Sequence, residues 1–219
     1  SLPKQFLEVH GKPIIVHTLE HFEDHPQIDG IVVAILPAYR PLLEKLLHRF
    51  ELSKVWIIDG GATGQESRHR ALEAVSERYP ADTVVLIHDG VRPLISEQLI
   101  DTNIAAVREH GSAITCTKVF ETIVVSESGK VDDVIPRDPL YTAQAPQSFL
   151  LGEVLDAYNR AVADGENASI DSCSVMRAYG HSVHIVEGPR SNIKITTVED
   201  FYVSRTFFDL VETQQLMES

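Results

Sequence analysis

The sequence alternates regularly between short apolar runs and longer amphipathic segments. Four apolar runs rich in β-branched residues predict strands: GIVVAIL at 30–36, KVWII at 54–58, TVVLI at 83–87 and AITCTK at 113–118. The amphipathic segments predict helices at 13–22, 41–50, 65–78 and 96–110, the last with Ser96 as its N-cap. Strands that alternate with helices in this way predict an α/β fold, a doubly wound and mostly parallel sheet with helices on both faces.

The alternation is interrupted between residues 119 and 140. The first half of this stretch alternates apolar and polar residues, and ESGK at 127–130 is typical of a hairpin turn. A two-stranded arm has little stability alone in water, so we expect it to pack against another surface. A second subunit is one candidate for that surface, and the arm's own domain is the alternative.

The stretch LYTAQAPQSF at 140–149 is predicted to be a short loop, because small and polar residues dominate it, and Pro146 is expected to open the next segment. The remaining chain predicts helices at 151–164 and 174–179, a strand at 181–187 and a terminal helix at 198–217. No repeat, linker or low-complexity tract separates these segments. We therefore expect residues 1–219 to form a single domain that carries an arm at 119–140.

The net charge of −13 argues against a general affinity for nucleic acid, which requires a basic face. An anionic ligand would have to be held by a local cluster of cations and backbone N–H groups. No apolar run reaches the roughly 18 residues of a membrane span, and no signal-peptide pattern is present. We therefore expect a cytoplasmic protein without a membrane partner.

Polar motifs follow the predicted strands at the end where such sheets bind ligands. DGGATGQES at 59–67 is a Gly-rich loop that runs into a helix, which favours an anion, although a tight turn explains it equally well. In HDGVRP at 88–93, Asp89 could hold magnesium and Arg92 a phosphate, or the two could form a structural ion pair. SNIKITT at 191–197 adds Lys194 shortly before the terminal helix.

Four cationic side chains lie in widely separated segments of this acidic chain: Lys4, Arg92, Arg137 and Lys194. Lys4 by itself would be interpreted as a solvated lysine. A doubly wound sheet, however, could gather all four at one edge. Catalysts of phosphoryl transfer need mainly such cations around the transferring phosphate, together with magnesium.

Six ordered motifs resemble those of the cytidylyltransferase family that activates polyol phosphates: LPKQF with GKPII, IDGG, HDGVRP, ETI, PRDPLYTAQAPQSF and NIKITT. The resemblance covers nearly the whole chain. It implies a Rossmann-like nucleotidyltransferase domain and a homodimer in which each β-arm reaches over the neighbouring active site. It also implies that CTP and a polyol phosphate, with Mg²⁺ bound, give a CDP-polyol and pyrophosphate.

The resemblance further implies roles for individual residues. Lys4 and Lys194 match the family's two lysines that neutralise the developing charge on the triphosphate. Gly61 and Ser67 match the loop that binds cytosine and ribose. Asp89 matches a residue near the ribose and the Mg²⁺ ion.

The polyol phosphate would be held by three other residues. Arg92 matches the arginine of the family's HDxxRP motif, and Thr122 and Arg137 match arm residues that reach the substrate from the partner subunit. Val91 and the run ETIVVS at 121–126 resemble the ribitol-5-phosphate enzymes. We therefore expect D-ribitol 5-phosphate as the substrate, with 2-C-methyl-D-erythritol 4-phosphate as the alternative.

One departure from the family favours a different class of function. The family's Gly-rich loop, which precedes PKQ and holds the triphosphate, is not found in this sequence, and a chain without it is expected to be inactive. A non-catalytic nucleotide-binding module is therefore the second hypothesis. An NAD-dependent oxidoreductase is a weaker third, because the G-x-G-x-x-G fingerprint is absent.

Overall fold

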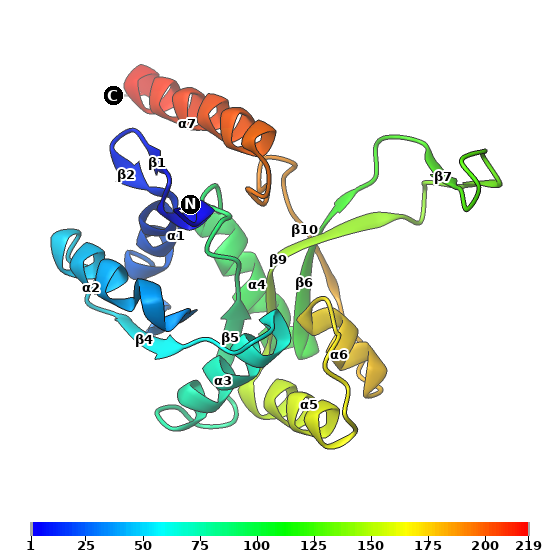
Figure 1. The fold of residues 1–219 in the computed structure, drawn as a ribbon, viewed down its shortest axis with the longest axis horizontal. Helices are drawn as coiled ribbons and strands as arrows, with labels where there is room; N and C mark the ends of the chain where they lie inside the picture. Colours follow the sequence, from blue (N-terminus) through cyan, green and yellow to red (C-terminus); the bar gives the residue numbers. More distant parts are fainter. Residues whose placement is uncertain (1, 219) are drawn as a thin grey trace.

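The computed structural model describes residues 2–218, which form a sheet-centred domain with a projecting arm (Figure 1). The helices are α1 (Ile14–Glu23), α2 (Arg40–Arg49), α3 (Gly64–Ser76), α4 (Glu97–His110), α5 (Leu151–Ala163), α6 (Ser172–Ala178) and α7 (Val198–Glu218), with 3₁₀ turns η1 (Lys4–Phe6) and η2 (Pro37–Tyr39). The strands are β1 (Glu8–Val9), β2 (Lys12–Pro13), β3 (Ile31–Ile35), β4 (Val55–Asp59), β5 (Val84–Ile87), β6 (Ser112–Lys118), β7 (Ile123–Val125), β8 (Asp133–Ile135), β9 (Tyr141–Leu150) and β10 (Ile185–Glu187).

The predicted helices and the four predicted strands of the first half are confirmed within one or two residues at most ends. Ser96 caps α4 as predicted, since its side chain accepts a hydrogen bond from the N–H of Leu99 at 3.2 Å. The strand predicted at 181–187 is shorter, because only its last three residues pair with β6. Local hydrophobic pattern was therefore sufficient to place most elements.

The predicted loop at 140–149 is wrong. These residues form β9, which lies between β5 and β6 and runs antiparallel to both, in the order β10-β6-β9-β5. The β6–β9 pairing shifts register between Ile114 and Cys116, and Pro146 lies in the shifted stretch. Proline lacks an N–H and is tolerated in sheets only at such irregularities or at edges, so a proline here does not end the strand. The sheet is consequently mixed.

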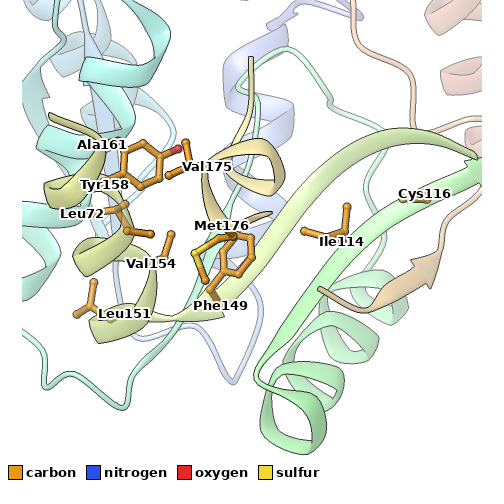
Figure 2. Close-up of a cluster of buried hydrophobic side chains, with 11 residues drawn as sticks. Leu72, Ile114, Cys116, Phe149, Leu151, Val154, Tyr158, Ala161, Val175 and Met176 are labelled. Carbon is orange, nitrogen blue, oxygen red and sulfur yellow. The ribbon is translucent and has the colours of Figure 1, made fainter. Parts of the chain in front are cut away.

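Helices cover both faces of the four-stranded sheet. Neighbouring residues on a strand point to opposite faces, and on β6 Ala113 packs with the residues of α4 whereas Ile114 packs with those of α5 and α6. The hydrophobic cluster around Ile114 also contains Phe149, Tyr158 and Met176 and is drawn in Figure 2. The three-layer arrangement confirms the predicted doubly wound α/β class.

Strands β3 and β4 pair in parallel with each other, but in the described structure neither is hydrogen-bonded to β5. A cavity of about 490 Å³ lies between β3 and β5. Residues of α1 and α3 also line it. The carboxyl ends of both strands therefore open toward one shared space.

The predicted hairpin is confirmed as β7 and β8, an antiparallel pair in register from Ile123–Ile135 to Val125–Asp133. It projects away from the helices that surround the sheet (Figure 1). Residues 119–140 are exposed, except Val119, Ile135 and Leu140, which are partly buried. Several of the exposed side chains are large and apolar: Phe120, Ile123, Val124, Val125, Val131 and Val134. Within residues 2–218, no helix is both long and apolar enough to cross a lipid bilayer.

Candidate active site

Three separate segments bring predicted site residues to the same cavity. Ser67 on α3, Asp89 after β5 and Lys194 before α7 all line it, together with Gln5 of η1. Parallel-sheet ligands bind beyond the carboxyl ends of strands, and Asp89 occupies that position directly after β5 and His88. Residues from four distant parts of the sequence therefore share one site.

Asp89 is the centre of the charged cluster. One carboxylate oxygen accepts a hydrogen bond from Lys194 Nζ at 3.1 Å, and the other accepts one from Arg92 Nε at 2.8 Å. Burial would raise the pKa of Asp89, but the hydrogen bond from Arg92 and the charges of Lys194 and Arg92 outweigh it and hold the pKa below its usual value. Asp89 is consequently an anion that keeps two cations in place.

Arg92 uses two of its three guanidinium nitrogens in hydrogen bonds within the protein. Its side chain is largely buried, and besides Asp89 it donates from Nη1 to the backbone oxygen of Asn192 at 2.7 Å. The structural ion pair that the sequence left open thus exists. In the described part of the chain Nη2 makes no hydrogen bond, so a ligand oxygen could still bind there.

His88 supports this turn without carrying charge. Its Nε2 donates to the backbone oxygen of Arg92 at 3.1 Å. Burial lowers the pKa of His88 to about 4, despite that hydrogen bond, so the ring is neutral near pH 7. The role of His88 is therefore to shape the Asp89–Arg92 turn.

The Gly-rich loop between β4 and α3 is closed by its own side chains. Ser67 Oγ accepts the N–H of Gly61 at 3.0 Å, and Glu66 accepts the N–H of Ala62 at 2.7 Å. A Cβ at position 61 would lie 2.4 Å from Cγ of Glu66, which explains why glycine is needed there. Thr63 caps α3 by accepting the N–H of Glu66. The loop is therefore a preformed turn, with Ser67 as its internal support.

The structure does not bring every predicted residue to the cavity. Lys4 is exposed in η1, next to Gln5, which does line the cavity. Thr122 and Arg137 are exposed on the arm, where Arg137 Nη1 donates to the backbone oxygen of Phe120 at 2.6 Å. Neither arm residue lines the cavity of its own chain. Gly61 and Arg92 do not line it either, although each is hydrogen-bonded to a residue that does, Ser67 and Asp89 respectively.

Two places offer carboxylates to a metal ion. Asp89 is the one acidic residue among the described residues that line the cavity, and Mg²⁺ commonly binds through a single carboxylate plus substrate phosphates. His25, Glu97 and Asp101 form a second group elsewhere. There, His25 Nδ1 accepts the N–H of Gln27, which leaves the proton on Nε2, where it is donated to Asp101. A hydrogen-bond network accounts for this second group, and we assign no metal to it.

Sequence reasoning missed Asn192. It is fully buried, with its side chain bonded to β9 and its backbone oxygen bonded to Arg92. The available indication was an asparagine two residues before Lys194 in a polar loop.

The fold and this cluster define an α/β protein whose cavity places cations around one carboxylate, at the position where such sheets bind phosphate-bearing ligands. Comparison with known proteins is more specific. The family model described as IspD, 2-C-methyl-D-erythritol 4-phosphate cytidylyltransferase, matches residues 1–209. The chain belongs to the IspD family, and it is therefore a cytidylyltransferase that uses CTP.

Individual relatives agree with this assignment. The ribitol-5-phosphate cytidylyltransferase of Streptococcus agalactiae serotype III (strain NEM316) is 46% identical, over 98% of this chain and 90% of the relative. The 2-C-methyl-D-erythritol 4-phosphate cytidylyltransferase of Clostridium novyi (strain NT) is 36% identical, over 97% of this chain and 91% of the relative. The crystal structure of 4-diphosphocytidyl-2C-methyl-D-erythritol synthase from Anaerococcus prevotii DSM 20548 superposes with a TM-score of 0.84 at 29% identity, covering 95% of this chain and 91% of that one.

Proposed function

We propose that this protein transfers CMP from CTP to D-ribitol 5-phosphate and releases CDP-ribitol and pyrophosphate. The observation that carries this proposal is the higher identity, 46% against 36%, to a relative named for ribitol 5-phosphate than to one named for methylerythritol phosphate. Val91 and the ETIVVS run of the arm point the same way.

In the proposed reaction, a phosphate oxygen of the polyol phosphate attacks the α-phosphorus of CTP. A new P–O bond forms as the bond to the β,γ-pyrophosphate breaks, and pyrophosphate leaves with the bonding electrons. Lys194 and Lys4 would stabilise the negative charge that builds up on the phosphates. Asp89 holds Lys194 at 3.1 Å, so the ammonium group is pre-oriented before the nucleotide binds.

Gly61 and Ser67 are proposed to bind the nucleoside part of CTP, because Ser67 lines the cavity and holds Gly61 through a hydrogen bond. Asp89 would contact the ribose and would hold Mg²⁺ together with the phosphates of CTP. That ion would neutralise phosphate charge.

The polyol phosphate is proposed to bind between Arg92 and a partner subunit's arm. Arg92 is bonded to Asp89, which lines the cavity, and has one guanidinium nitrogen without a hydrogen bond in the described residues. Thr122 and Arg137 are exposed on an arm that projects from its own domain. The exposed apolar residues of the arm support burial in a homodimer. In this proposal, each active site takes Thr122 and Arg137 from the other copy.

The decisive experiment follows pyrophosphate release from CTP and Mg²⁺ with each polyol phosphate in turn. We expect kcat/KM for D-ribitol 5-phosphate to exceed that for 2-C-methyl-D-erythritol 4-phosphate by at least about tenfold, a difference of roughly 1.4 kcal/mol in transition-state binding. The reverse preference would show that the protein acts on the methylerythritol substrate, after which its family model is named. Tight CTP binding in calorimetry without release from either polyol would instead support a non-catalytic module.

A further inference from the structure

Lys194 lies in a segment without regular structure, between β10 and α7. The position of this lysine is set by fixed points on both sides. After it, Ile195 donates its N–H to Val91 at 3.0 Å and buries its side chain with Val9 and Ile14. Before it, the fixed point is Asn192, which has no exposed surface.

Asn192 is attached to the sheet at the irregularity in β9. The register shift of the β6–β9 pair takes residues 144–146 out of the regular ladder. Their three backbone oxygens are each satisfied by a side chain: Gln147 Nε2 for Gln144 at 3.2 Å, Asn192 Nδ2 for Ala145 at 2.6 Å and Thr115 Oγ1 for Pro146 at 2.7 Å. Two of these donors belong to the sheet itself, whereas Asn192 belongs to the lysine segment.

The orientation of the Asn192 amide is fixed by this contact. A carbonyl oxygen can only accept a hydrogen bond, so the atom that faces Ala145 must be the amide nitrogen. The backbone oxygen of Asn192 accepts from Arg92, whose Nε bonds to Asp89. A continuous chain of hydrogen bonds thus runs from β9 through Asn192, Arg92 and Asp89 to the ammonium group of Lys194.

We propose that Asn192 is a positioning residue for cytidylyl transfer, fixing where the ammonium group of Lys194 meets the transferring phosphate. A lysine side chain is long and flexible, so its charge is placed accurately only if its backbone and its partner Asp89 are both fixed. Asn192 fixes the backbone through β9 and the partner through Arg92. This inference rests on the proposed role of Lys194.

The test is a double-mutant cycle on kcat, measured as pyrophosphate release by the full-length protein. We expect Asn192→Ala to lower kcat by about 10-fold to 100-fold, because a misplacement of about 1 Å has effects of this size, with a smaller change in KM for CTP. In the Lys194→Ala background, Asn192→Ala should lower kcat no further than about twofold, since the group that it positions is already gone. Equal effects of Asn192→Ala in both backgrounds would overturn the proposal.

Asn103 provides the matched control. It is also a fully buried asparagine, and its amide donates to Leu99 and Thr115. It lies on α4 and supports β9 through Thr115 and Ser148, but in the described residues it makes no hydrogen bond to the lysine segment. Asn103→Ala should lower the melting temperature while leaving kcat unchanged at a temperature where the variant is folded. If Asn192→Ala does not fold, Asn192→Asp replaces it in the cycle. Asp has the shape of Asn but lacks the amide N–H donor, so its effects on kcat in the two backgrounds should be the same as those expected for Asn192→Ala. A normal kcat in Lys194→Ala would refute the role of the lysine in the proposed function. If Lys194→Ala lowers kcat, and Asn192→Ala lowers it by the same further factor with or without Lys194, only the positioning role is refuted.

Discussion

Lys194 and Asp89 are 105 positions apart in the sequence, and their side chains meet at 3.1 Å. The contact joins the loop after β5 to the segment before α7, the two places in the chain that carry the proposed chemistry. An ammonium group held by a half-buried carboxylate is ordered before any ligand arrives. Removing either charge should therefore affect the reaction more than the stability of the fold.

Lys194→Ala is expected to lower kcat by about 100-fold or more, and Lys4→Ala should do the same, because each would remove a cation that stabilises charge in the transition state. Steady-state rates of pyrophosphate release measure this. Lys45→Ala is the control, since it removes an exposed lysine charge on α2, away from the cavity. Activity near that of the unmodified protein in both Lys4→Ala and Lys194→Ala would contradict the roles proposed for them.

Ser67→Ala should weaken the binding of CTP. Ser67 Oγ accepts the N–H of Gly61 and donates to the backbone oxygen of Thr63, so its loss loosens the loop proposed to bind the nucleoside. A neutral hydrogen bond contributes about 1 kcal/mol, which corresponds to roughly a fivefold change in affinity. Calorimetric titration with CTP tests the prediction. Ser76→Ala, at the other end of α3, should leave the affinity unchanged.

Arg137→Ala should raise KM for the polyol phosphate more than KM for CTP, because the arm is proposed to hold only the polyol. Kinetics with each substrate varied in turn would reveal the difference. Lys130→Ala removes a positive charge at the tip of the same arm and is the control. Parallel increases in both KM values for Arg137→Ala would argue against a specific polyol contact.

The arm is also expected to be the dimer contact. Val124→Asp would place a charge among its exposed apolar residues and should convert a dimer into a monomer. Sedimentation of the two proteins at matched concentration measures this. A Val124→Asp protein that sediments like the parent would mean that the arm is not the interface.

The start of α7 should show a defined pH dependence. Asp200 accepts hydrogen bonds from Thr196 Oγ1 and from the N–H groups of Thr196 and Thr197, chiefly the first, which together lower its pKa to about 2. Because the folded-state pKa is depressed, this stabilisation is present above the unfolded value near 4 and is lost as the pH falls toward 2.

Asp200→Asn should therefore lower the free energy of unfolding by about 1 kcal/mol at pH 7, a typical value for a helix cap. Urea denaturation at pH 7 and at successively lower pH values should show the gap between variant and parent narrowing below pH 4. Glu199→Gln alters a neighbouring acid of the same first turn, whose side chain makes no hydrogen bond in the described residues, and should show little effect. A constant gap across this pH range would contradict the assignment.

The sequence predicted elements wherever one local pattern dominated. Ser96 could be identified as a cap from its place before an amphipathic run, and the turn at 127–130 from its Gly and polar residues. β9 could not be predicted from local pattern, because Gln144, Pro146 and Gln147 oppose a strand locally. They are accommodated by partners far away in the chain, such as Asp171 for Gln147 at 3.0 Å.

The candidate site was predicted as a set of charges but not as a network. HDGVRP and NIK could be recognised separately, and the structure joins Asp89 to Lys194. The ion pair between Asp89 and Arg92 was an open alternative in the sequence, because the two residues are three positions apart. The contact of Arg92 with Asn192 could not be deduced, because it depends on how the loop after β5 and the lysine segment come together. Asn192 was missed for the same reason, since a buried asparagine in a polar loop has no local periodicity that reveals it.

The register shift in β9 also sets how this chain can change in length. One residue added to or removed from 141–150 would move the backbone oxygen of Ala145 away from Asn192, and would turn buried side chains such as Phe149 toward the opposite face of the sheet. The tip of the arm at 127–130 is exposed and carries no such contact to the domain. Insertions and deletions should therefore be tolerated at the arm's tip but should disrupt the protein in β9. The length of this strand thus sets the spacing between the sheet and the lysine segment.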